Sequence, residues 1–220
     1  MALRPVFMPD YRKPGSFKEF NVEFNWVSGF SIKQKQKSIL SLHESIQKKF
    51  EGIKILEIST KSITAVGVKA SAFNLMIPDK NGLSEYSVEA AFQSAKKFEY
   101  GGPYDDIRKM SSRKAKTDQR LRNSGKLISF EFFGQEWKLT PMTAFYDWLY
   151  INALYLNIEI HKEILDYDAF TDIEFNPKKS INCQARSAAI FVSLYQSQAI
   201  KKVLSSKKEF LMIYQDKLEK

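Results

Sequence analysis

A capped helix that leads directly into a short strand is the feature that most limits how this chain can fold. Ser31 is a typical helix N-cap residue, and apolar residues follow it at helical spacing until Gly52, a residue type that ends helices. Residues 53–58 then alternate as a strand with one buried face does. Because neither an all-helical nor an all-β architecture accommodates both signals, we expect a mixed fold.

The rest of the chain adds further helices and a few short strands. We predict the α+β class, with a single helix-rich domain and a small β-sheet over residues 1–205 and a basic C-terminal helix or tail over residues 206–220. The elements expected after residue 60 are strand and loop over 65–76, a helix from Ser87 to Gly101-Gly102-Pro103, a basic helix or helical turn over 104–122, a strand over 127–133, a helix over 141–156, a polar loop over 166–182, and helices over 183–204 and 207–218.

Composition narrows the class of protein further. The chain has 220 residues, 44% of them hydrophobic, which is enough for a real core. One cysteine, Cys183, excludes an internal disulfide and fits a reducing compartment. Two histidines and that cysteine have no zinc-site spacing, so we expect neither a metal nor a cofactor. The longest apolar run, residues 188–192, is too short to span a bilayer, so we expect a cytoplasmic protein without a membrane partner.

The net charge of +9 is unevenly distributed along the sequence. Basic residues are concentrated over 96–126, at Lys33, Lys35 and Lys37, and around Lys178, Lys179 and Arg186. Such clusters form either a solvated basic surface or a site for nucleic acid or a phosphorylated ligand. Trp26 and Phe30 stand just before the Lys33–Lys35–Lys37 cluster, where either ring could stack on a base or pack in the core.

Glu89, Gln93 and Lys96 form the first candidate site. On a continuous helix, residues four and seven apart share one face, so an acid, an amide and an amine would act on one substrate. A neighbouring cation, Lys97, would lower the pKa of Lys96 and favour the free amine that acts as a nucleophile. The alternative is an ordinary exposed helix face with a Glu–Lys stripe.

Two further stretches carry polar groups that suit an anionic ligand. Lys116 and Arg120 offer phosphate contacts, although a solvated loop is the simpler interpretation. Asp172 and Asn182 lie in a polar segment before an apolar helix, where they are either ligand contacts or ordinary turn and cap residues. Neither histidine stands in a suggestive relation to Cys183, so that thiol is a poor candidate for a nucleophile.

Several runs in this order resemble the NADAR superfamily. Its pattern is matched by Ser71-Ala72-Phe73-Asn74-Leu75, by Val88-Glu89-Ala90-Ala91-Phe92-Gln93-Ser94-Ala95-Lys96, and by Ala115-Lys116 with Arg120. Runs at 30–39, 98–104, 143–150 and 170–185 resemble the NADAR branch associated with DarT-type toxins. The resemblance covers residues 4–195.

The resemblance implies an antitoxin with a NADAR-like fold that hydrolyses the N-glycosidic bond between ADP-ribose and guanine bases of DNA. The implied partners are ADP-ribosylated DNA, ADP-ribose and, functionally, a DarT-type toxin. Lys96 would form a Schiff base, with Lys116 in reserve, and Glu89 and Asp172 would be the acid–base groups. ADP-ribose would contact Gln93, Lys116, Arg120, Asn74 and Asn182, and DNA would contact Lys33, Lys35, Lys37 and Trp26.

Two other functions remain compatible with the sequence. The first is an N-glycosidase of a small phosphorylated metabolite, which has no evident need for the three lysine clusters. The second is a non-catalytic module that binds ADP-ribose or nucleic acid, which has no need for a nucleophilic lysine at position 96.

Overall fold

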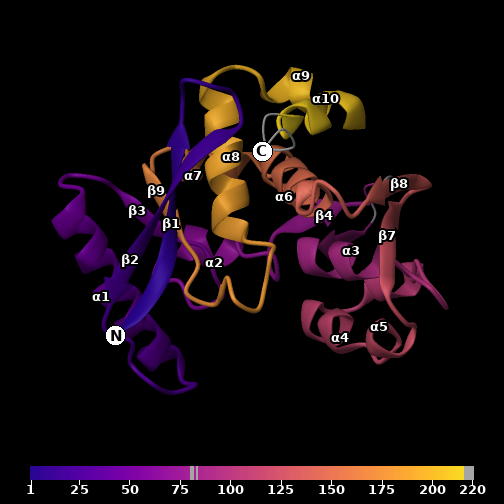
Figure 1. Ribbon diagram of the computed structural model, residues 1–220, viewed down its shortest axis with the longest axis horizontal. Helices are drawn as coiled ribbons and strands as arrows, with labels where there is room; N and C mark the ends of the chain where they lie inside the picture. Colours follow the sequence, from indigo (N-terminus) through magenta and orange to yellow (C-terminus); the bar gives the residue numbers. More distant parts are fainter. Residues whose placement is uncertain (80–81, 83, 216–220) are drawn as a thin grey trace.

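A computed structural model describes residues 1–79, 82 and 84–215. A four-stranded sheet with the order β2-β1-β9-β3 forms one half of the molecule (Figure 1). Its hairpin consists of β1 (Ala2–Asp10) and β2 (Ser16–Phe24), and the short strands β3 (Ile55–Glu57) and β9 (Ala169–Thr171) pair in parallel. Because strand residues alternate in direction, Val6 packs toward one core cluster and Phe7 toward the other.

Helices cover both faces of this sheet. Helix α1 (Ile32–Lys49) packs through Ile39, Leu42 and Ile46 on the face that carries Val6. Helix α8 (Gln184–Gln196) contributes apolar residues to the larger core cluster that contains Phe7. The predicted start of α1 is confirmed, because the Ser31 hydroxyl accepts the N–H of Gln34 at 3.2 Å and forms a capping box.

The other half is built around helix α6 (Ala144–Leu156), whose aromatic side chains pack against a three-stranded sheet with the order β6-β7-β8. Phe145 lies 4.9 Å from Phe130 and 5.6 Å from Trp137, measured between ring centroids. The remaining elements of this half are β4 (Met76–Pro78), β5 (Glu85–Ser87), α3 (Val88–Ser94), β6 (Lys96–Phe98), η1 (Asp105–Lys109), α4 (Ser112–Thr117), α5 (Arg120–Asn123), β7 (Leu127–Phe132) and β8 (Gln135–Lys138).

The last segments complete the larger core. Helix α7 (Ile158–Ile164) follows α6, and α9 (Ile200–Leu204) and α10 (Lys207–Met212) follow α8. Phe210 of α10 is fully buried in that core and lies in the segment predicted as a basic C-terminal helix or tail. Residues 216–220, the end of that tail, lie outside the described residues. No helix in the described part of the chain has the length and apolar character needed to cross a membrane.

The predicted α+β class is confirmed, and so are the strands at 55–57 and 127–132, but four expectations were wrong. Residues 65–69, which we expected to be strand and loop, form helix α2 (Ala65–Lys69), capped by the Thr64 hydroxyl, which accepts the Gly67 N–H at 3.2 Å. The helix from Ser87 ends at Ser94, because Lys96 and Lys97 pair with β7 and the N–H of Glu131 donates to the Ala95 carbonyl at 2.7 Å. The polar loop over 166–182 contains the sheet strand β9. The helix over 183–204 is interrupted at Gln198, whose φ is +57°.

Candidate active site

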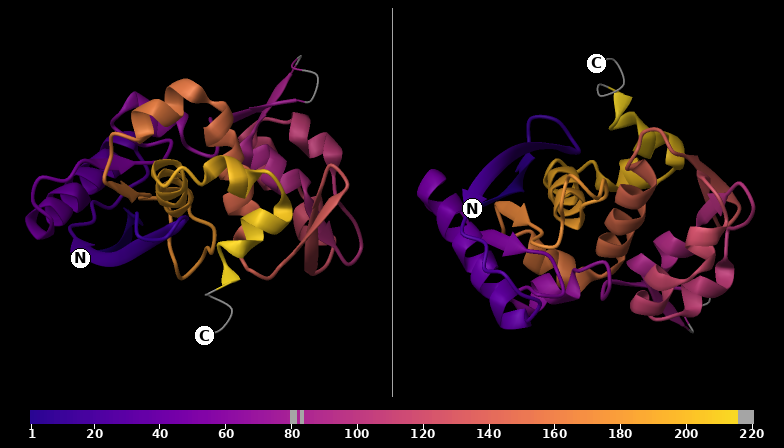
Figure 2. Two further views of the ribbon diagram at one scale, coloured as in Figure 1. Left: turned by 90° about the horizontal axis from the view of Figure 1, so that it is seen from above. Right: turned by 60° about the horizontal axis from the view of Figure 1, so that its bottom comes forward.

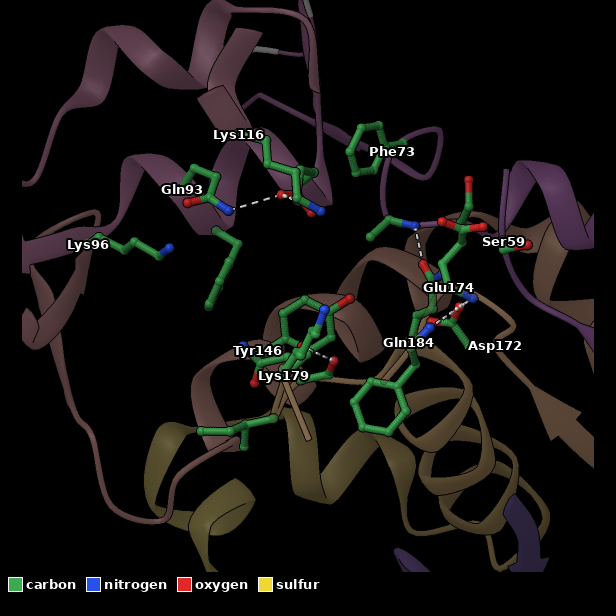
Figure 3. Close-up of a pocket in the computed structure, with 18 of the residues that line it drawn as sticks. Ser59, Phe73, Gln93, Lys96, Lys116, Tyr146, Asp172, Glu174, Lys179 and Gln184 are labelled. Carbon is green, nitrogen blue, oxygen red and sulfur yellow. Dashed lines mark hydrogen bonds and ion pairs between the residues drawn. The ribbon is translucent and has the colours of Figure 1, made fainter. Parts of the chain in front are cut away.

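A cavity of about 870 Å³ is lined by segments from both halves of the molecule, a volume suited to a nucleotide-sized ligand (Figure 3). Lys96, Gln93 and Lys116 lie on one side of the space, while Asp172, Glu174 and Gln184 lie on the other. Tyr146 and Lys179 lie between these two groups in the same view. Charged and amide side chains that line the cavity are Lys61, Glu89, Gln93, Lys96, Lys116, Asp172, Glu174, Lys179, Asn182 and Gln184.

The Lys96 side chain enters this cavity from the first residue of β6. Its amine lies 5.1 Å from the ring centroid of Phe92. Burial lowers the pKa of Lys96, and the charge of Lys116 lowers it further, while the negative charge of Glu89 raises it. The site therefore favours the neutral amine more than water does.

The predicted reason for a reactive Lys96 was wrong in its geometry. We expected Lys96 and Glu89 to share a helical stripe, with Lys97 as the second cation. Because Lys96 and Lys97 are consecutive strand residues, their side chains take opposite directions, and Lys97 pairs with Glu131 at 3.2 Å. The strand nevertheless brings Lys96 into the cavity that Glu89 and Gln93 line.

Glu89 and Gln93 occupy successive turns of α3 and are both buried. The Gln93 amide donates to Glu89 Oε1 at 2.9 Å, which orients its own Oε1 away from that bond. This Oε1 atom is buried and accepts no hydrogen bond from the described residues. Lys116 Nζ lies 4.0 Å from Glu89 and 5.1 Å from the Phe73 ring centroid. Gln93 is therefore ready to accept a hydrogen bond from a ligand hydroxyl or amine.

Asp172 is the buried acid on the other side of the cavity. Its Oδ1 accepts the N–H groups of Glu174 at 3.0 Å and Phe175 at 3.2 Å. Burial and the charge of Glu57 raise the pKa of Asp172 to about 8. Gln184 supports this wall, because its amide accepts from the Ala72 N–H and donates to the Ile58 carbonyl, both at 2.7 Å.

Asn182 also lines the cavity, and its buried Oδ1 accepts no hydrogen bond from the described residues. Two other predicted ligand contacts are not among the lining residues. Arg120 pairs with Asp106 at 2.6 Å and with Asp118 at 2.9 Å, so its guanidinium is used within the protein. Asn74 is exposed and donates to the Val68 carbonyl at 2.9 Å.

The predicted nucleic-acid residues divide into two groups. Lys33 and Lys37 are exposed on α1. Lys35 instead pairs with Glu174 of the cavity wall at 3.3 Å and lies 4.6 Å from the Trp26 ring centroid. Trp26 is partly buried, with Arg4 at 5.3 Å from the same centroid. Phe30 is fully exposed, so it is the ring of this loop that is open to a partner.

Sequence reasoning missed several residues that form or support the cavity. Tyr146 lies in the helix predicted over 141–156, for which the sequence suggests no functional role. Gln184 lies in the run 170–185, in which only Asp172 and Asn182 are candidate site residues. Glu57 could have been identified from the sequence, because a charged residue within an apolar strand is rarely buried unless it has a polar partner. Lys61 and Lys179 could be assigned to the cavity only once the fold was known.

The described residues offer no group of three or more His, Cys, Asp or Glu side chains that could bind a metal ion. Cys183 is buried, and burial raises the pKa of its thiol well above the ordinary value. A buried thiol with a raised pKa is a poor nucleophile. The groups suited to chemistry in this cavity are therefore the Lys96 amine and the carboxyl groups of Glu89 and Asp172.

The fold and the cavity define a compact α+β protein with a ligand-sized polar site that contains a desolvated lysine. The family model described as "DarT1-associated NADAR antitoxin" matches residues 2–220. The chain therefore belongs to the family of DarT1-associated NADAR antitoxins, and the resemblance read from its motifs is confirmed. A comparison with curated proteins found no match.

Proposed function

We propose that this protein removes ADP-ribose from guanine bases of DNA and so reverses the modification made by a DarT-type toxin. The bond hydrolysed joins the distal ribose of ADP-ribose to a guanine amine. The observation that carries the proposal is the Lys96 amine, which is desolvated, faces the cavity and lies near Glu89. Family membership supplies the connection to the toxin.

The cavity has the groups that an ADP-ribose ligand needs. Lys61, Lys116 and Lys179 line it and can neutralise the diphosphate. Phe73 and Phe175 supply apolar surface for the ligand's rings and sugars. The unpaired acceptors of Gln93 and Asn182 fit ribose hydroxyls or base amines.

The reaction balances as a transfer of the anomeric carbon to Lys96. The neutral amine attacks this carbon, the ring C–O bond and the bond to guanine both break, and a C=N bond forms. One amine proton goes to the ring oxygen and the other to the departing guanine amine, with Glu89 as the proton carrier. Water then adds to the imine, and collapse of the adduct releases open-chain ADP-ribose and restores the lysine amine.

Burial favours Lys96 over Lys116 as the nucleophile. The Lys116 side chain is 57% exposed, so its ammonium stays hydrated beside Glu89. Burial lowers the pKa of the Lys96 amine. Lys116 is then better suited to contact the diphosphate and to lower the pKa of Lys96 by its charge.

The DNA would bind beside the cavity, along the loop before α1. Phe30 is exposed there, and Lys33 and Lys37 follow on the first turns of the helix. A base attached to ADP-ribose in the cavity must leave the duplex stack or come from a single strand. An exposed ring flanked by lysines is suited to stack on a neighbouring base while the lysines contact phosphates.

The test is release of ADP-ribose from modified DNA by Lys96→Ala and Lys96→Arg. Both variants should lose activity by a factor of about a hundred or more, because neither can form an imine. Borohydride added during turnover should trap an ADP-ribose adduct on Lys96 of the unchanged protein. Lys97→Ala is the matched control, since its side chain pairs with Glu131, and it should stay active.

Three other results would change the assignment. An active Lys96→Ala protein would exclude the Schiff base, and an adduct on Lys116 would move it to that residue. Activity on a small phosphorylated N-glycoside but not on modified DNA would favour the metabolite enzyme. Binding of ADP-ribose by the unchanged protein without any hydrolysis would favour the non-catalytic module.

A further inference from the structure

Glu57 is a buried acid that is not among the residues lining the cavity, yet it accepts hydrogen bonds from the residues on either side of Asp172. Its side chain is 2% exposed, and β3, which carries it, pairs in parallel with β9. Glu57 Oε2 accepts the Thr171 hydroxyl at 2.7 Å, and Oε1 accepts the Ile173 N–H at 2.8 Å. Both of its oxygens are thus used by donors, an arrangement that favours the ionised carboxylate.

The neighbouring histidine does not neutralise this carboxylate. His43 Nε2 lies 3.0 Å from the Thr171 hydroxyl oxygen, and since Thr171 donates to Glu57, the histidine is the donor to Thr171. Burial lowers the pKa of His43 to about 4, so the ring is uncharged at neutral pH. The chain from His43 through Thr171 to Glu57 therefore directs hydrogen bonds toward Glu57 without adding a positive charge.

The Asp172 carboxyl has a different arrangement of donors. The N–H groups of Glu174 and Phe175 both reach the same oxygen, Oδ1, and the side-chain amide of Gln184 is a further donor that acts on this carboxyl group. Two buried carboxyl groups close together do not both ionise readily. Burial raises the pKa of Glu57 as well as that of Asp172. Because Glu57 has a donor on each oxygen, whereas the two backbone donors of Asp172 reach a single oxygen, the arrangement favours the charge on Glu57 and the proton on Asp172.

The surroundings of the pair include one cation that opposes this arrangement. The positive charge of Arg4 acts on Asp172, Glu174 and Glu57 together, while its Nη1 donates to the Leu3 carbonyl at 3.0 Å. Lys35 is paired with Glu174. Despite the charge of Arg4, the pKa of Asp172 rises to about 8, since burial and the charge of Glu57 outweigh it. Other titratable groups near the pair are His43, Tyr146, Tyr150, Glu174 and Cys183.

We propose that Glu57 is a positioning residue that keeps Asp172 uncharged, so that this wall offers the ligand a hydrogen-bond donor in place of an anion. The consequence for ADP-ribose rests on the proposed function. A diphosphate ligand is repelled by an ionised carboxylate in a desolvated wall, whereas a carboxylic acid can donate to a ligand oxygen or ring nitrogen. Asp172 then contributes to ligand binding rather than to proton transfer at Lys96, which lies across the cavity.

The test follows the titration of Asp172 itself and needs no enzymatic activity. In protein labelled with ¹³C at aspartate carboxyl groups, the signal absent from Asp172→Asn identifies this residue. It should titrate near pH 8 in the unchanged protein. In Glu57→Gln, which keeps the size of the side chain but has no charge, the midpoint should fall by about one unit or more. Thr171→Val, which removes one donor to Glu57, should lower the midpoint by less.

Glu174→Gln is the control for removal of a nearby acid, because Glu174 is a partly exposed residue of the same wall that pairs with Lys35. It should shift the Asp172 midpoint much less than Glu57→Gln does. The proposal is overturned if Asp172 titrates near pH 4 in the unchanged protein, or if Glu57→Gln and Thr171→Val both leave its midpoint unchanged. These readouts stand whether or not the protein hydrolyses ADP-ribosylated DNA.

Calorimetric binding of ADP-ribose then tests the consequence for the ligand. Affinity should fall by up to about tenfold per pH unit above the midpoint of Asp172. In Glu57→Gln this fall should begin at a lower pH, and in Asp172→Asn it should be absent. If affinity falls identically with pH in the unchanged protein, Glu57→Gln and Asp172→Asn, the proton on Asp172 has no role in ligand binding. This conclusion would hold even if the carbon titration shows that Glu57 raises the midpoint of Asp172.

Discussion

At the scale of single residues, the site depends on how burial and two neighbouring charges act on one amine. Burial disfavours the ammonium form of Lys96, Lys116 adds repulsion, and Glu89 opposes both by attraction. Because Glu89 also accepts from Gln93, its carboxylate is held in place by the same helix that forms the wall. The site thus lowers the pKa of Lys96 while it keeps the carboxylate that the proposed reaction would use.

Glu89→Gln should slow turnover by about a hundredfold or more, a typical contribution of an acid–base group, while ADP-ribose affinity changes by less than about tenfold. The amide keeps an oxygen that can accept from Gln93, so the fold should survive. Single-turnover hydrolysis beside calorimetric binding separates the two effects. Loss of the native circular dichroism spectrum would instead mark Glu89 as a structural residue.

The pH dependence of kcat gives a paired test of the same charges. Activity should rise with pH as Lys96 loses its proton, with a midpoint below the ordinary lysine value because its pKa is lowered. Glu89→Gln removes an attractive anion, so this midpoint should move to lower pH. Lys116→Gln removes a repulsive cation, so it should move to higher pH, by less than about one unit because Lys116 is largely exposed. Shifts in the same direction would contradict the assignment.

At the scale of secondary-structure elements, the junction between α3 and β6 shows what the sequence could and could not predict. The Ser87 cap, the Glu89–Gln93 helix and the α1 capping box are local signals, and all three are present. The end of α3 at Ser94 is not local, because it depends on pairing with β7 more than thirty residues later. The sequence therefore predicted that Glu89, Gln93 and Lys96 act together, but it predicted one continuous helix where the protein has a helix followed by a strand.

Strand β9 was missed for a related physical reason. It has three residues and lies in a polar stretch, and it becomes a central strand only by pairing with β1 and β3. Its position places Asp172 at the cavity and Thr171 beside Glu57. Short strands buried by distant partners carry little local pattern, so the Glu57–Asp172 pair could not have been predicted from the sequence.

Helices α6, α8 and the C-terminal segment are joined by one buried carboxylate. Asp147 of α6 is fully buried, pairs with Arg186 of α8 at 3.2 Å and accepts the hydroxyl of Tyr214 at 2.7 Å. Asp147→Asn leaves the largely buried Arg186 without a counter-charge, so it should lower the free energy of unfolding by about 3 kcal/mol. Urea unfolding followed by circular dichroism measures this loss.

The exposed Glu159–Lys162 pair provides the control for removing a salt bridge. Glu159→Gln should change the free energy of unfolding by less than about 0.5 kcal/mol. An Asp147→Asn protein as stable as Glu159→Gln would mean that the two helices and the C-terminal segment are held by apolar packing alone.

At the scale of the whole molecule, the basic surfaces lie in separate regions. Helix α4, with Lys116, and the loop that carries Phe30 are near the lower edge in Figure 1, whereas α9 is at the upper edge. Two further orientations are shown in Figure 2, in which α1 and the α4–α5 region occupy opposite ends of the molecule. A DNA strand with its modified base in the cavity would approach the lower edge and leave α9 free.

Binding to modified DNA should weaken steeply with salt, because lysines that contact phosphates release counterions. Replacing Lys33 and Lys37 by Ala should weaken binding and reduce the slope of log affinity against log salt by about one unit for each true phosphate contact. Replacing Lys201 and Lys202 of α9, which are also exposed, removes the same charge from the far edge and should leave the slope nearly unchanged. Equal losses in both double variants would indicate a general effect of net charge.

Phe30→Ala completes this test, because it removes the exposed ring without changing the charge. Base stacking is worth about 1–3 kcal/mol, so affinity for modified DNA should fall by about fivefold or more while the salt slope stays the same. Hydrolysis of a minimal ADP-ribosylated guanosine should be unaffected, since this substrate has neither a neighbouring base nor flanking phosphodiesters. An equal loss of activity on DNA and on the minimal substrate would mean that Phe30 supports the cavity rather than DNA binding. If Phe30→Ala lost neither DNA affinity nor activity, the lysines alone would have to account for DNA binding.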